Sequence, residues 1–110
     1  MAELSINELK DIVMQLATEK KFGTKPEEIN VGEKMCLIHS EVAEAYEAYR
    51  HQNIDGKDGF KEELADIILR VLHMCGIFDV NIEEELLKKM EYNKTRVWDF
   101  KKINEKSTST

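Results

Sequence analysis

The sequence predicts an all-α fold, a four-helix antiparallel bundle-like protomer that associates into a homo-oligomer through helix faces. Apolar residues recur with a helical period in four segments, and strand-like alternation is weak throughout. Three of these segments begin with Ser or Asn followed three residues later by Glu, a spacing typical of helix N-termini. With 110 residues the chain has room for one domain. We therefore expect one helical domain over residues 1–96 and a partly disordered tail over residues 97–110.

The first predicted helix spans residues 5–21. Ser5 and Glu8 have the spacing of a capping box, and the apolar residues that follow keep the helical period. Gly23 is expected to end this helix, because glycine tolerates the left-handed backbone common at helix C-termini. Residues 23–30 hold the only proline and predict a connecting loop.

The second predicted helix begins at an Asn30 N-cap, with Glu33 three residues later, and runs to about His51. The next segment, residues 52–59, carries two glycines and two aspartates and predicts a turn. Asp58 is expected to be the N-cap of the third helix.

The third predicted helix, from about Phe60 to Gly76, is apolar over most of its circumference, which is typical of a central or interface helix. A protomer of four short helices cannot easily cover that much apolar area, so we expect a homodimer or homotetramer. The fourth helix starts at an Asn81 cap and ends near Lys94.

Two pairs of carboxylates distinguish the second and third helices. Glu41 and Glu44 form one pair, and Glu63 and Asp66 form the other. Residues three apart lie on the same side of a helix, so each pair forms an acidic edge. At about 100° of rotation per residue, Glu41 falls in the middle of an otherwise apolar arc. An antiparallel return through residues 52–59 would let the two edges face each other.

Such a cluster needs a compensating charge. Burying an unpaired carboxylate costs several kcal/mol, and four that converge raise one another's pKa unless a cation neutralises them. Oxygen ligands without a nearby thiolate favour Mg²⁺, with Mn²⁺ as a substitute. Because Mg²⁺ favours phosphate oxygens, the site implies a substrate with a di- or triphosphate group.

Composition and charge argue against several classes of partner. Acidic residues number 22 and basic residues 16, for a net charge of −6, which disfavours binding to duplex nucleic acid. No apolar run approaches the length that spans a bilayer, and the N-terminus is unlike a signal peptide, so we expect no membrane association. Cys36 and Cys75 lack metal-site spacing and are interpreted as small core residues in a reducing compartment. A cytoplasmic protein is expected.

The order E-x-x-E, spacer, E-x-x-D, present here as EVAE and ELAD, resembles the MazG-like all-α nucleoside triphosphate pyrophosphohydrolases, relatives of dCTP pyrophosphatase and the dimeric dUTPases. The resemblance extends from about Gly32 to Arg96. It implies hydrolysis of a nucleoside triphosphate to the monophosphate and pyrophosphate by water attacking the α-phosphorus with Mg²⁺, as in nucleotide-pool housecleaning. Carried over by motif position, the metal ligands and catalytic carboxylates are Glu41, Glu44, Glu63 and Asp66. One of them would orient or deprotonate the water.

Further site residues follow by position. The segment that lies near the substrate phosphates in this family matches Lys89, Asn93 and Arg96, with Lys94 adjacent. A helix C-terminus whose cations complement the dipole is the alternative interpretation of this segment. Lys34 lies seven residues before Glu41 and shares its helix face, so it can reach the acidic site or a phosphate. Glu62 is either an outer-shell base or a solvated glutamate at a helix start.

Other interpretations stay open. Arg70 and His73 extend the polar strip of the third helix and are expected to pair with acids rather than ligate metal. A carboxylate-bridged di-iron protein is disfavoured because no E-x-x-H pair occurs. A non-catalytic helical regulator that binds a nucleotide or a protein is the alternative to an enzyme. Aromatic residues such as Phe22 and Trp98 could stack on a base, but the sequence does not identify that base.

Overall fold

The computed structural model describes residues 3–96, which form four α-helices, one 3₁₀ turn and no strand. The all-α prediction is confirmed. The elements in chain order are α1 (Ile6–Lys20), the 3₁₀ turn η1 (Pro26–Glu28), α2 (Val31–Arg50), α3 (Phe60–Ile77) and α4 (Ile82–Thr95).

Three helix starts follow the predicted caps. The Ser5 side chain accepts a hydrogen bond of 3.1 Å from the Glu8 amide, and the Glu8 carboxylate accepts one of 3.2 Å from the Ser5 amide, which completes a capping box. Asn30 and Asn81 each accept a hydrogen bond from the amide three residues later. These side chains satisfy amides that the first turn of a helix leaves without a backbone partner.

At the end of α1 and the start of α3, the helix boundaries agree with the prediction to within one residue, but the predicted capping residues were wrong. α1 ends at Lys20, and its C-cap is Lys21 rather than Gly23, because Lys21 itself takes the left-handed conformation with φ of 59°. The N-cap of α3 is Gly59 rather than Asp58, and it makes no side-chain hydrogen bond to the helix. Asp58 is held in a left-handed conformation with φ of 56°, and its amide donates to the Glu62 carboxylate.

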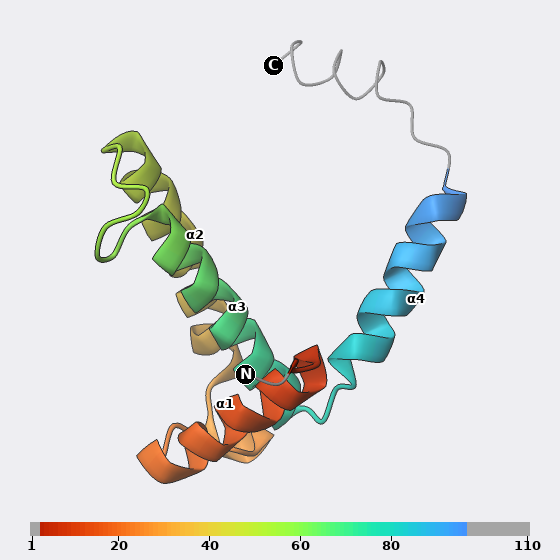
Figure 1. Ribbon diagram of the computed structural model, residues 1–110. Coiled ribbons are helices and arrows are strands. Elements are labelled where there is room, and N and C mark those ends of the chain that lie inside the picture. The colour runs from red at the N-terminus through yellow and green to blue at the C-terminus, as the bar shows by residue number, and fades with distance from the viewer. Residues whose placement is uncertain (1–2, 97–110) are drawn as a thin grey trace.

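α2 and α3 form an antiparallel hairpin, and α1 packs across α3 near its C-terminal end (Figure 1). The crossing of α1 and α3 is close because Gly76 has no side chain: a Cβ atom there would overlap Sδ and Cγ of Met14. The buried apolar residues come from these three helices and are Ala17, Ala45, Leu72, Cys75 and Ile77. This small core fixes the hairpin and places α1 beside it.

α4 leaves this core and points away from the hairpin (Figure 1). None of its residues is buried, and its main contact is with α1. The radius of gyration is 17.1 Å, against about 13 Å for a compact chain of this size. Large apolar side chains stay exposed on α3 and α4, among them Ile68 at 55% and Leu87 at 62%.

Three further expectations concern the tail, the two cysteines and the absence of a membrane-spanning helix. The tail over residues 97–110, with Trp98, lies outside the described residues. Cys75 is buried as expected, but Cys36 is exposed, and both are free thiols. Within residues 3–96, no helix combines the length and apolar character needed to cross a membrane.

Candidate metal centre

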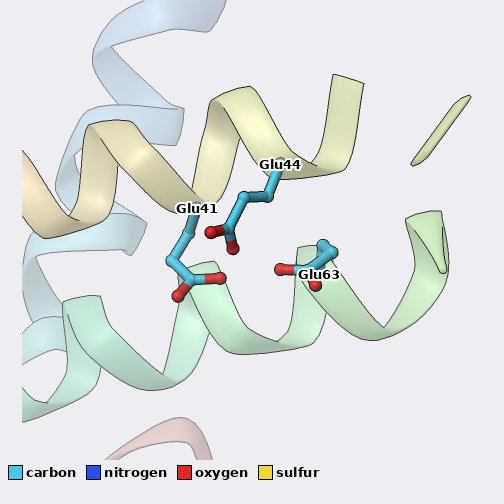
Figure 2. Close-up of side chains that lie close together, drawn as sticks. All are labelled: Glu41, Glu44 and Glu63. Atoms are coloured by element: carbon cyan, nitrogen blue, oxygen red, sulfur yellow. The ribbon is translucent and has the colours of Figure 1, made fainter. Parts of the chain in front are cut away.

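Three of the four predicted carboxylates meet between α2 and α3. Glu41 and Glu44 project from α2 and Glu63 from α3, and one carboxylate oxygen of each lies within 4.8 Å of the others. Figure 2 shows the three side chains directed into the space between the two helices. We call these residues the acidic cluster. Asp66, one turn further along α3, is exposed and lies outside the cluster.

Two of the three carboxylates in the acidic cluster are largely buried. Glu63 is only 7% exposed, and the Glu41 side chain is 13% exposed. The Oε2 atoms of Glu41 and Glu63 are both buried, and no described N–H or hydroxyl group donates to either. Buried oxygens of this kind are normally paired with a donor, a shared proton or a cation.

The two buried carboxyls have pKa values shifted in opposite directions. A hydrogen bond with Glu41 is the main cause that raises the pKa of Glu63 to about 7, and burial and the nearby charges of Glu41, Glu44 and Asp66 act in the same direction. The pKa of Glu41 is lowered, first by the hydrogen bond from Glu63 and then by Arg70, against the opposing effect of burial. When no cation is bound, the shared proton is therefore held on Glu63 rather than on Glu41, and it is released as pH rises through about 7.

Arg70 of α3 supplies the one cation paired with the cluster among the described residues. Its Nε and Nη2 atoms each lie 3.1 Å from Oε1 of Glu41. The expectation that Arg70 pairs with an acid is confirmed. His73 instead donates from Nε2 to the backbone carbonyl of Gly23 at 2.8 Å, so its expected acidic partner was wrong.

A cavity of about 460 Å³ borders the cluster at Glu41. Its polar wall comes from α2 and α3 and includes Lys34, Asp66 and Arg70, and its apolar wall comes mainly from α1 and the segment after it. The apolar lining residues are Val13, Leu16, Ala17, Phe22 and Leu69. Sequence reasoning did not assign the α1 residues to the site, because their helical period marks them only as core positions.

The other predicted residues lie in different places. Lys34 lines the cavity, as its position on the face of Glu41 suggested. Glu62 is exposed and accepts a hydrogen bond of 3.1 Å from the Asp58 amide, outside the cluster. The remaining residues are on α4 and at its end, where the helix points away from the cluster (Figure 1): Lys89, Asn93, Lys94 and Arg96.

The basic side chains of α4 have local partners within the same chain. Lys89 and Arg96 lie over the ring of Tyr92 at 5.0 Å and 5.7 Å, and Lys94 forms an ion pair of 3.5 Å with Glu91. These are exposed contacts that contribute little to stability, so they leave the cations able to exchange partners.

The acidic cluster has the donor set of a hard cation. Three carboxylates provide oxygen ligands alone, and neither free thiol belongs to the group. The two buried oxygens without N–H or hydroxyl donors fit the same interpretation.

The chain matches no family model, and comparisons with curated proteins and with solved structures find no similar protein.

Proposed function

We propose that this chain hydrolyses (deoxy)nucleoside triphosphates to the monophosphate and pyrophosphate with Mg²⁺, in nucleotide-pool housecleaning, as its resemblance to the MazG-like family implies. The observation that carries the proposal is the pair of buried oxygens on Glu41 and Glu63, which lie beside Glu44 and receive no N–H or hydroxyl donor among the described residues. A hard cation at this point would offset the cost of burying them.

In this proposal Glu41, Glu44 and Glu63 would hold the cation. Asp66, which lies outside the cluster one turn further along α3, would have to turn toward it to act as a fourth ligand. Bound Mg²⁺ supplies a charge that polarises phosphate oxygens and lowers the pKa of water. The water oxygen forms a bond to the α-phosphorus as the bond to the bridging oxygen breaks, and pyrophosphate leaves. One of the cluster carboxylates orients the water and accepts its proton. Lys34 provides positive charge for the phosphates from the cavity wall.

The cavity beside the cluster is suited to the nucleoside. Its volume of about 460 Å³ lies in the range of small-molecule sites, and its apolar wall faces a polar one. Phe22 lines it and can stack on a flat ring. A base placed there would leave the phosphates at Glu41 and Lys34, where the proposed cation is held.

A homodimer or homotetramer completes the proposal. The exposed apolar side chains of α3 and α4 need a partner, and α4 does not close a bundle over the hairpin within one chain. A second protomer could cover the hairpin and present Lys89, Asn93 and Arg96 to the acidic cluster of the first. Sedimentation at micromolar concentration tests the association, and a monomer would contradict it.

The activity is tested by release of pyrophosphate from a panel of canonical and modified nucleoside triphosphates, with MgCl₂ or EDTA. Glu41→Gln should abolish metal-dependent release while the helical circular dichroism is kept. Glu47→Gln is the matched control, because Glu47 lies on the same helix outside the cluster and pairs with His51. No metal-dependent release from any nucleotide would refute the proposal.

Lys89 offers a second test of the assignment. Lys89→Met should raise KM for the nucleotide more than it lowers kcat, because the side chain is proposed to bind phosphate. Lys88→Met is the neighbouring control, since Lys88 pairs with Glu84. Equal effects of the two substitutions would argue that α4 contributes no specific phosphate contact.

A non-catalytic regulator that binds a nucleotide or a protein is the second candidate. The proton shared by Glu41 and Glu63, together with the Arg70 ion pair, supports it, because these contacts can stabilise the cluster without a metal. Titration calorimetry that detects nucleotide binding without turnover would favour this candidate over the enzyme.

A further inference from the structure

The junction between α3 and α4 is short and carries its own hydrogen bonds. Asp79 takes a left-handed conformation with φ of 54°, and the Val80 amide donates to the Cys75 carbonyl at 2.8 Å. Asn81 follows directly and caps α4 by accepting from the Glu84 amide at 3.1 Å. With four residues between the two helices, a change in a few backbone angles would redirect the whole of α4.

Two side chains from the start of α1 bind this junction. The Asn7 amide nitrogen donates to Oδ1 of Asn81 at 2.8 Å, and Oδ1 of Asn7 accepts from the Glu83 amide at 3.3 Å. The Lys10 ammonium donates to the Val80 carbonyl at 2.8 Å. Asn7 thereby satisfies one of the first-turn amides of α4 from outside the helix, and Lys10 holds the carbonyl just before the cap.

We infer that Asn7 and Lys10 are positioning residues that set the direction in which α4 leaves the core. No residue of α4 is buried, and its main packing partner is α1, so these three hydrogen bonds are a large part of what holds it. We call the three hydrogen bonds made by Asn7 and Lys10 the clamp. Because α4 carries Lys89 and Asn93, the clamp decides where the proposed phosphate-binding segment lies. This functional consequence rests on the proposed hydrolysis of nucleoside triphosphates, but the effect on helix direction does not.

The direction of α4 is measured by pulsed electron resonance between spin labels at Glu19→Cys on α1 and Glu91→Cys on α4. The background is Cys36→Ser, Cys75 is buried, and labelled protein is diluted in excess unlabelled protein so that only distances within one chain are seen. Asn7→Ala combined with Lys10→Met should broaden or shift the distance distribution. Gln15→Ala on α1 is the control, and Lys10→Arg, which keeps the donor, should preserve the narrow distribution.

The consequence for the reaction is measured with the best nucleotide substrate. Asn7→Ala and Lys10→Met should each raise KM severalfold with little change in kcat. Lys10→Arg, which keeps the donor, should have the KM of the wild type. A distance distribution that stays unchanged in the double variant overturns the inference. If the wild-type protein hydrolyses no nucleotide, the proposed function fails, and the spin-label distances alone decide whether the clamp positions α4.

Discussion

Replacing Gly76 by Ala tests the contact that places α1 beside the hairpin that carries the acidic cluster. A Cβ atom at this position would overlap Sδ and Cγ of Met14 and lie 3.1 Å from its Cε. Inserting a methyl group into packed structure typically costs about 1–3 kcal/mol. Ala is favoured over Gly within a helix by about 1 kcal/mol, which offsets part of that cost. We expect a net destabilisation of about 1 kcal/mol, and up to about 2 if Met14 cannot adopt another rotamer.

The matched control is Gly32→Ala on α2. A Cβ atom there has only Oδ1 of Asn30 nearby, at 3.4 Å, so the helix preference of Ala should dominate. We expect a gain of up to about 1 kcal/mol at this position. The two substitutions make the same chemical change, so a difference in sign isolates the effect of the Met14 contact.

The assay is equilibrium unfolding in urea, followed by helical circular dichroism at one fixed protein concentration, because association would otherwise change the apparent stability. Met14→Ala should remove most of the cost of Gly76→Ala in a double-mutant cycle. The reasoning is refuted if Gly76→Ala stabilises the protein as much as Gly32→Ala does. It is also refuted if the cycle shows no coupling between Gly76 and Met14.

Two further predictions concern the acidic cluster. The pKa of Glu63 is raised from 4.5 to about 7, so between these pH values the metal-free folded state binds more protons than the unfolded state. The melting temperature in EDTA should therefore fall as pH rises from 5 to 7. The pKa of Glu41 is lowered, so its contribution is lost only at more acidic pH, and Glu63→Gln should flatten the profile between pH 5 and 7. Arg70→Met leaves the buried Glu41 carboxylate without its cation, so it should lower the metal-free melting temperature and enlarge the increase produced by MgCl₂. An equal MgCl₂ response in wild type and Arg70→Met would count against competition between Arg70 and a metal for Glu41.

Local signals in the sequence were enough for the helices and most of their starts. Ser5, Asn30 and Asn81 cap their helices as predicted, because a cap depends on residues within one turn. The predictions failed at Gly23 and Asp58, where a residue nearby is the cap instead. Lys21 takes the left-handed conformation two residues before Gly23, which itself has φ of 100°, and Asp58 takes it one residue before the N-cap Gly59.

The candidate site was predictable in part. The pattern of carboxylates on two consecutive helices identified Glu41, Glu44 and Glu63, which the structure brings together. It did not separate Glu63 from Asp66. Residues three apart share a helix face but differ by about 4.5 Å along the axis, so the register of the α2–α3 hairpin decides which one meets the facing glutamates.

By itself, the sequence determined an all-α chain and a set of carboxylates placed to face one another, because periodicity and capping are local properties. Only the tertiary structure decided that Arg70 pairs with Glu41, that α1 forms the wall of the neighbouring cavity, and that α4 points away from the cluster. These outcomes depend on how helices cross and on the angles of short junctions. Contacts distant in sequence, such as Gly76 with Met14 and Asn7 with Asn81, set both.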